Sequence, residues 1–128
     1  MVIDGDPLFA YFVSLVETSD SAMTVTLAVR GALIGGTLIG SVAYVDGLAK
    51  LLPAAIPDEQ MSAQWRQALR DAAATGRGAI DQEATRVDYA HLRDVQIVDA
   101  GGQPMTYPYW RVRLAAIDGW AFGAAPAT

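Results

Sequence analysis

Residues Met23–Gly47 read MTVTLAVRGALIGGTLIGSVAYVDG, and this stretch decides the fold because two runs of strand-forming residues flank a glycine in it. In the first run, apolar residues recur at every second position and so share one face of an extended strand: Val25, Leu27 and Val29. Gly31 can adopt the positive φ that a tight turn requires, and Leu33–Ile39 can return antiparallel to the first run. The stretch therefore predicts a β-hairpin, which we expect Asp46-Gly47 to close.

The same stretch carries no charge from Gly31 to Val45, a run of about 15 residues. A helix needs roughly 17–25 apolar residues to cross a bilayer. Gly36 and Gly40 have the GxxxG spacing of membrane-helix dimers, but the density of glycines favours a bent hairpin. We therefore expect no membrane span.

Two helices are predicted outside the hairpin. The first covers Asp6–Glu17, because Asp6 can cap it and apolar residues recur along one face: Leu8, Phe9, Phe12, Leu15 and Val16. The second starts at Pro57-Asp58-Glu59, where acidic residues complement the helix dipole, and carries an apolar stripe of Met61, Trp65, Ala68, Leu69 and Ala72. Between them, Gly47–Pro57 predicts a single helical turn that Pro53 ends.

The C-terminal third predicts strands. His91–Val98 alternates well enough to form one, and Gly101–Pro104 predicts the turn that follows. Alternation is cleanest in the next strand, which we expect to direct Trp110, Val112 and Leu114 inward and Arg111 and Arg113 outward. Asp118-Gly119 indicates a further hairpin, from which Trp120–Gly123 runs back.

The predicted fold is therefore α+β: an N-terminal helix followed by a strongly bent antiparallel sheet of about five strands, with a helix inserted in mid-sheet. This order suits a small SH3-like or Sm-like barrel, because glycines allow the bending that a barrel needs. We expect one domain over residues 1–128, with a core at about 7–123, a mobile loop at 76–88 and a frayed tail at 124–128.

Composition excludes several classes of function. The net charge of −5 and the pI of about 4.6 argue against a nucleic-acid binder, which needs a basic surface for phosphates. The absence of cysteine excludes disulfides, thiolate metal sites and a thiol nucleophile, and suits a reducing compartment. The N-terminal MVIDGDP lacks the basic start of a secretory signal, so we expect a cytoplasmic protein.

No reactive constellation is evident. His91 is the one histidine; it has no evident catalytic partners, and we expect it to be bonded to the backbone at the start of a strand. The carboxylates are scattered over caps, turns and helix faces, and no phosphate-loop or nucleophile-elbow motif stands in the chain. We therefore expect no enzyme, no metal and no cofactor.

Three residues are candidates for binding a partner. Trp65 lies in an alanine-rich helix that could offer it to a groove, whereas Trp110 and Trp120 lie in alternating strands and are expected to anchor the core. Arg111 and Arg113 share one strand face and could pair with an acidic partner, although a solvated face is the commoner outcome.

Three segments resemble the gas vesicle accessory protein family called GvpU: LFAYFVSLVE with the hairpin after it, YAHLRDVQIVDAGG, and YWRVRLAAIDGWAFG. The resemblance covers roughly residues 7–123 and is weakest across Leu52–Asp88. It implies a cytoplasmic, non-enzymatic accessory of gas vesicles, the gas-filled protein shells that give prokaryotic cells buoyancy. It also implies self-association into a homo-oligomer and contact with gas vesicle shell proteins, through which vesicle assembly or clustering is influenced.

Two alternatives belong to other classes. Residues 31–38, with Gly31, Ile34, Gly36, Thr37 and Leu38 in place, are similar to the first motif of Sm-like RNA-binding modules. However, Val42–Val45 reads VAYV where the residues for base contact should follow. A small hydrolase that uses His91 is the other alternative, and it would lose activity on His91→Ala substitution.

Overall fold

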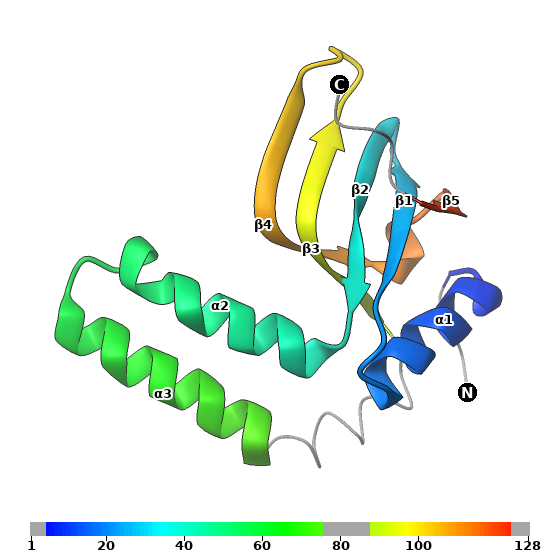
Figure 1. Cartoon of the computed structure of the whole chain (residues 1–128). Helices are drawn as coiled ribbons and strands as arrows, with labels where there is room; N and C mark the ends of the chain where they lie inside the picture. Colours follow the sequence, from blue (N-terminus) through cyan, green and yellow to red (C-terminus); the bar gives the residue numbers. More distant parts are fainter. Residues whose placement is uncertain (1–4, 76–87, 124–128) are drawn as a thin grey trace.

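A computed structural model of the chain describes residues 5–75 and 88–123, so the loop expected at 76–88, apart from Asp88, and the tail expected at 124–128 lie outside the described residues. Along the chain a helix precedes a hairpin, two helices, two strands, a single 3-10 turn and a last strand (Figure 1). Their bounds are α1 Pro7–Thr18, β1 Met23–Val29, β2 Ala32–Ile39, α2 Ser41–Ala55, α3 Glu59–Thr75, β3 Tyr89–Val98, β4 Pro104–Arg113, η1 Leu114–Ala116 and β5 Gly119–Phe122.

The strands form a five-stranded antiparallel sheet in the order β4-β3-β2-β1-β5. This arrangement confirms the α+β class, the N-terminal helix and the antiparallel sheet. The described strands do not close into a barrel, since β4 and β5 are the two edges of the sheet. The expected SH3-like or Sm-like barrel is therefore not confirmed.

The predicted hairpin is present, with β1 and β2 paired from Met23↔Leu38 to Val29↔Ala32. Its two-residue turn consists of Arg30 and Gly31, with φ values of 50° and 84°. Positive φ at both positions matches the right-handed twist of the two strands, which is why glycine is favoured there.

The last strand does not pair as expected. Asp118-Gly119 was expected to turn β4 back on itself, but η1 follows β4 and β5 pairs with β1 instead. The reason is a long-range contact: the Asp118 carboxylate accepts a hydrogen bond from the Arg30 amide at 2.9 Å, and the Asp118 amide donates to Ala28 O at 2.8 Å. These bonds attach the end of η1 to the hairpin turn and direct β5 along β1.

The sheet bends at Asp94, which has a φ of 52°. The register between β2 and β3 shifts beside it, and the buried face of β3 changes from Ala90 and Leu92 to Val95 and Ile97. This is the behaviour of a β-bulge.

β4 bends with its neighbour, and this corrects the prediction for Trp110. Val112 and Leu114 are buried and Arg111 and Arg113 are exposed, as expected, but the Trp110 side chain remains 36% exposed. It packs on the Tyr107 ring, with centroids 4.8 Å apart, at the rim of the core rather than inside it.

The core lies between α1 and one face of the sheet. α1 begins at the Asp6 cap, whose carboxylate accepts a hydrogen bond from the Leu8 amide at 2.8 Å. Phe9 and Val13 of the helix are 1% and 2% exposed and belong to the same cluster as Val25 and Leu27 of β1.

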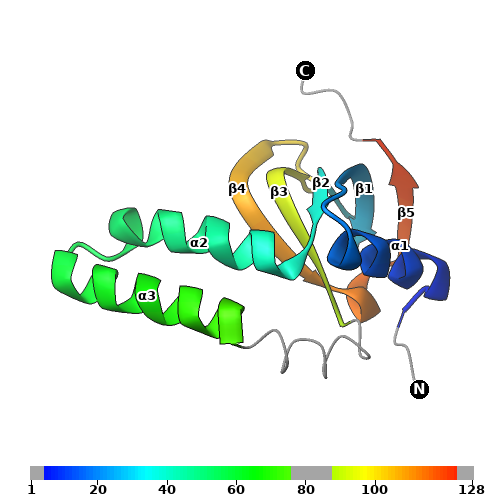
Figure 2. The ribbon, with the colours of Figure 1, turned by 60° about the horizontal axis from the view of Figure 1, so that its bottom comes forward.

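α2 is the largest departure from the prediction. The chain does not continue as a strand to Asp46-Gly47, and it forms more than one helical turn, since a helix runs through Ser41–Ala55 with Pro53 inside its last turn. Two helices are therefore inserted between β2 and β3, where the prediction had one. α2 and α3 pack side by side and project away from the sheet, and we call this pair the helical arm (Figure 2).

α3 begins close to the predicted position. The Asp58 carboxylate accepts hydrogen bonds from the Gln60 and Met61 amides at 3.0 and 3.1 Å, which is the bonding expected of a helix cap. No helix among the described residues is long and apolar enough to span a membrane.

Candidate interaction surfaces

Trp65 lies on α3 with 52% of its surface exposed. Met61, one turn earlier on the predicted apolar stripe, is 42% exposed, whereas Ser62 is buried. The predicted stripe is therefore open to solvent in its first two turns. An exposed tryptophan on a projecting helix can enter a partner's groove with a large contact area.

Arg111 and Arg113 lie on the outer strand β4 and are exposed. The Arg111 guanidinium stacks over the Tyr89 ring, with Cζ 3.7 Å from the ring centroid. This cation–π contact holds the guanidinium flat against the sheet and leaves its charge available to a partner.

The two candidate sites do not form one surface. Trp65 lies on α3 and the two arginines on β4. α3 packs on α2, and α2 is the helix of the arm that contacts β3 and β4 (Figure 1). A partner that contacts all three residues would have to extend around the base of the arm.

His91 lies at that base and is 9% exposed. Its ring packs on Tyr44 of α2, with centroids 4.8 Å apart, and Nδ1 has no hydrogen-bond partner among the described residues. The backbone bond expected for this histidine is therefore not found at Nδ1. Burial, with a smaller contribution from the positive charge of Arg111, lowers the pKa of His91 from 6.5 to about 4.

Tyr44 belongs to the same contact. Its burial raises the pKa of the phenol above 10.0, although the positive charge of Arg111 acts in the opposite direction. Both rings are thus neutral near pH 7, so the contact between these two side chains is an uncharged aromatic one.

A glycine allows α2 to approach the sheet at this point. A Cβ added at Gly47 would overlap the Tyr109 ring, with Cε1 only 2.6 Å away. Tyr109 in turn meets Tyr44 edge to face, with centroids 6.0 Å apart. Only glycine allows α2 to pack against this ring without displacing it.

The first turn of α2 is attached to α1 by Glu17. The Glu17 carboxylate accepts hydrogen bonds from the Ser41 amide and from Ser41 Oγ, the latter at 2.9 Å. A carboxylate at the start of a helix is favoured by the partial positive charge there. The arm is therefore held at its base by one carboxylate and by the packing of Tyr44 and Gly47.

The described residues hold no cluster of three or more histidine and acidic side chains that could bind a metal. The predicted absence of an enzymatic site stays a prediction.

Sequence reasoning missed one surface, which we call the aromatic patch. It consists of Leu8, Tyr11, Phe12 and Leu15 of α1 and Phe122 of β5. Tyr11 is 58% and Phe122 61% exposed. Phe12 contacts Phe122 edge to face at 5.2 Å and Tyr11 at 5.9 Å, so the rings are continuous.

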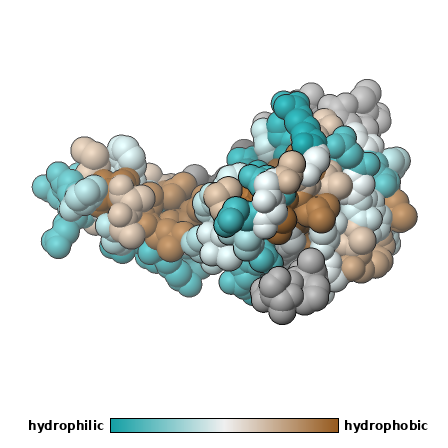
Figure 3. All heavy atoms as spheres, turned by 90° about the horizontal axis from the view of Figure 1, so that it is seen from above, coloured by the Kyte–Doolittle hydropathy of each residue, from teal (hydrophilic) through white to brown (hydrophobic). Residues whose placement is uncertain are grey.

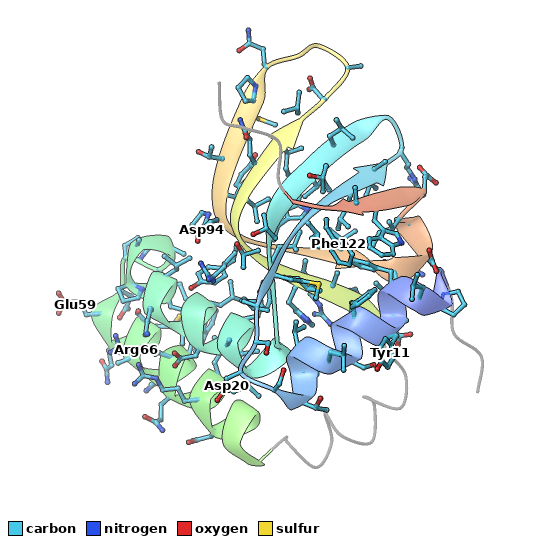
Figure 4. All side chains as sticks on the ribbon, turned by 45° about the vertical axis from the view of Figure 1, so that its right-hand side comes forward. Tyr11, Asp20, Glu59, Arg66, Asp94 and Phe122 are labelled. Carbon is cyan, nitrogen blue, oxygen red and sulfur yellow. The ribbon has the colours of Figure 1, made fainter. Side chains whose placement is uncertain are left out.

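The patch lies away from the arm. Figure 4 shows Tyr11 and Phe122 on one side of the molecule, whereas Glu59 and Arg66 of α3 lie on another. Seen from above, apolar residues gather along the arm and again over the body of the domain (Figure 3).

The signal for the patch was in the sequence. α1 is apolar over nearly its whole circumference, PLFAYFVSLVET, and one face of a helix cannot bury so many apolar side chains. The structure buries Phe9, Ala10, Val13 and Val16, so Leu8 and Leu15, predicted to lie on the inner face, are exposed instead.

These features describe a class of small α+β proteins with an open sheet, a projecting helical arm and exposed apolar surfaces. The model of one family, described as gas vesicle protein GvpU-like, matches residues 6–125 and so covers nearly the whole chain. The chain belongs to this GvpU-like family, as its resemblance predicted. A search of the curated proteins finds no match.

Family membership makes the chain a gas vesicle accessory protein. Such families are not known for enzymatic activity.

Proposed function

We propose that this protein self-associates in the cytoplasm and binds the gas vesicle shell, and thereby influences how vesicles assemble or cluster. The family match supports the association with gas vesicles. One observation supports binding as the mode of action. Exposed apolar side chains and exposed cationic side chains lie on different elements of one small domain, Trp65 on α3 and Arg111 and Arg113 on β4.

The arm is the proposed contact with the shell. Trp65 and Met61 are exposed on α3, and the arm projects from the sheet, so a shell protein can reach this helix without meeting the body of the domain. A half-exposed tryptophan is a typical anchor of a binding interface.

Arg111 and Arg113 are proposed to add an electrostatic attraction to shell binding. They lie on the edge strand β4 of a chain whose net charge is −5, so they offer a local positive surface to an acidic partner. Attraction between exposed charges is screened by salt, so this contribution should weaken as ionic strength rises.

Flotation with purified gas vesicles tests the proposal. The wild-type protein is expected to rise with the vesicles, Trp65→Ala to rise less, and the double variant Arg111→Gln/Arg113→Gln to lose the salt-sensitive part of binding. Leu33→Ala removes a comparably exposed apolar side chain elsewhere. Arg30→Gln/Arg93→Gln makes the same change in net charge as the arginine variant, at exposed positions outside the arm and β4.

If the wild-type protein stays below the vesicle layer at low salt, the proposed shell binding is wrong. If the control variants lose as much binding as the test variants, the shell contact lies elsewhere. The Sm-like RNA alternative stays a prediction, which a salt-dependent gel shift at low micromolar protein would test.

A further inference from the structure

The two edges of the sheet differ in how they are protected. The β4 edge carries Pro104, Pro108, Arg111 and Arg113, and prolines and charges are the residues that natural edge strands use against pairing with other chains. The β5 edge reads Gly-Trp-Ala-Phe and carries neither a proline nor a charge. In the part of the chain that the structure describes, β5 is therefore the edge less protected against strand addition.

Among the described strands, β5 pairs with β1 alone, so its other side has no partner strand there. Gly123 donates its amide hydrogen to Thr24 O at 2.7 Å, so it faces β1. Because successive residues of an antiparallel strand face opposite neighbours, Ala121 also faces β1, while the N–H and C=O groups of Trp120 and Phe122 face outward. A strand added to β5 would bond to these two residues.

The aromatic patch extends this edge. Phe122 packs on Phe12 and on Trp120, with centroids 5.2 and 5.3 Å apart, yet remains 61% exposed. Trp120 donates a hydrogen bond from Nε1 to the Asp6 carboxylate at 2.8 Å, which fixes its ring beside α1. The open strand is thus flanked by rings held in place, and an added strand would cover them.

We propose that β5 is the site where two copies of this chain join, strand to strand, into one continuous sheet. The inference rests on the proposed self-association and names the surface that carries it.

Charge favours a second copy as the occupant. The chain has a net charge of −5, so two copies repel each other except where their surfaces are uncharged. β5 and the five residues of the aromatic patch include no aspartate, glutamate, lysine, arginine or histidine. A two-fold contact places each patch against its own copy, which an uncharged patch permits.

The backbone fixes the register of such a pair. Bonds between the outward-facing residues are satisfied when Trp120 of each copy pairs with Phe122 of the other. Ala121 then lies opposite Ala121 of the second copy as a non-hydrogen-bonded pair, in which the two Cα atoms are roughly 4.5 Å apart. This separation is within the range of a disulfide.

The absence of cysteine from the chain makes this register directly testable. Ala121→Cys is expected to form a cross-linked dimer under mild oxidation, because its two thiols would face each other. Thr106→Cys on the β4 edge is the matched control and is expected to remain a monomer under denaturing conditions. Equal cross-linking of both variants would overturn the proposed register.

A charge-swap experiment tests whether the partner is a second copy. Phe122→Glu and Phe122→Lys should each lower the mass measured by light scattering, because like charges would lie near each other across the two-fold axis. A mixture of the two variants should restore the dimer. Leu33→Glu, at another exposed apolar position outside the patch, should leave the wild-type mass unchanged.

The outcomes separate this inference from the proposed function. Self-association that persists in Phe122→Glu and Phe122→Lys would overturn pairing through β5 and leave the proposed function standing. A monomeric wild-type protein that still floats with vesicles would overturn both the pairing and self-association, but not shell binding. Loss of flotation in Phe122→Glu without a change in mass would assign this edge to the shell and overturn pairing between copies.

Discussion

A histidine buried against a tyrosine, with Nδ1 unpaired among the described residues, has a structural consequence at the residue scale. His91 is held as the neutral ring near pH 7, because a second positive charge beside Arg111 would be both buried and repelled. The contact between α2 and the sheet therefore depends on the protonation of one residue.

Lowering the pH should reduce the stability of the protein, because the unfolded chain protonates His91 more readily than the folded chain does. The pKa of His91 is about 4 in the folded protein and 6.5 at its ordinary value, so below pH 6.5 the unfolded chain binds a proton that the folded chain does not. The free energy of unfolding should drop progressively from about pH 6.5 to about pH 4 and then level off, by roughly 3 kcal/mol at most.

Urea unfolding at several pH values measures this loss, with His91→Phe as the comparison because it keeps a ring against Tyr44 and cannot titrate. The difference in free energy of unfolding between the two proteins should not vary with pH above pH 7, and below it should change by up to roughly 3 kcal/mol. Asp6 titrates at a lower pH than this, because the hydrogen bond that Trp120 donates to the Asp6 carboxylate lowers the pKa of this carboxyl below 3.8. Parallel pH profiles of the two proteins would contradict the assignment to His91.

Gly47 gives a second prediction at this scale. Alanine is normally the better helix former by about 0.5–1 kcal/mol, but at this position its Cβ would overlap the Tyr109 ring. Gly47→Ala should therefore destabilise the wild-type protein by roughly 1–2 kcal/mol, in the range of an overpacked contact. In a Tyr109→Ala background the same substitution should become stabilising.

Unfolding of the four proteins of this double-mutant cycle measures the coupling between the two residues. Gly119→Ala is the control, because a Cβ at Gly119 would meet no atom within 4 Å. If Gly47→Ala has the same effect with and without the Tyr109 ring, the close approach of α2 is not what requires glycine.

At the scale of elements, local patterns predicted what local interactions determine. Alternating valines and Gly31 are enough to specify the first hairpin, and Asp6 and Asp58 specify the starts of two helices, because these effects act within a few residues. Contacts between residues far apart in the sequence determine the elements whose prediction was wrong. α2 reads locally as strand and turn but is stabilised as a helix by Glu17, 24 residues earlier.

The same reason applies to β5 and to the candidate sites. Asp118 bonds to Arg30, 88 residues away, and no local signal could indicate that contact. The exposure of Arg111 and Arg113 followed from strand alternation, whereas Trp65 was predicted on an apolar stripe and its exposure was left open. The aromatic patch was missed because the helix was assumed to bury one face and to leave the rest polar.

Glu17 provides a test at this scale. Glu17→Ala removes the acceptor for the Ser41 amide and hydroxyl and should destabilise the protein by about 1 kcal/mol, as loss of a helix cap does. Hydrogen exchange should quicken first at Tyr44, whose amide bonds to Gly40 O at 3.1 Å in the first turn of α2. Asp20→Ala, an exposed change in the neighbouring connector, should leave these rates unchanged.

At the scale of the whole molecule, the proposed binding surfaces lie on separate elements. Trp65 lies on the arm, the two arginines on the β4 edge and the aromatic patch beside β5. A domain that binds the shell on one surface and a second copy on another can connect two vesicles. A domain with one surface could coat a vesicle but could not link it to the next.

The growth of particle size in a suspension of dispersed vesicles tests this claim most directly. Purified wild-type protein should raise the mean particle size, whereas Phe122→Glu should float with the vesicles yet leave them dispersed. Vesicles that stay dispersed with the wild-type protein, or that cluster equally with Phe122→Glu, would contradict the account.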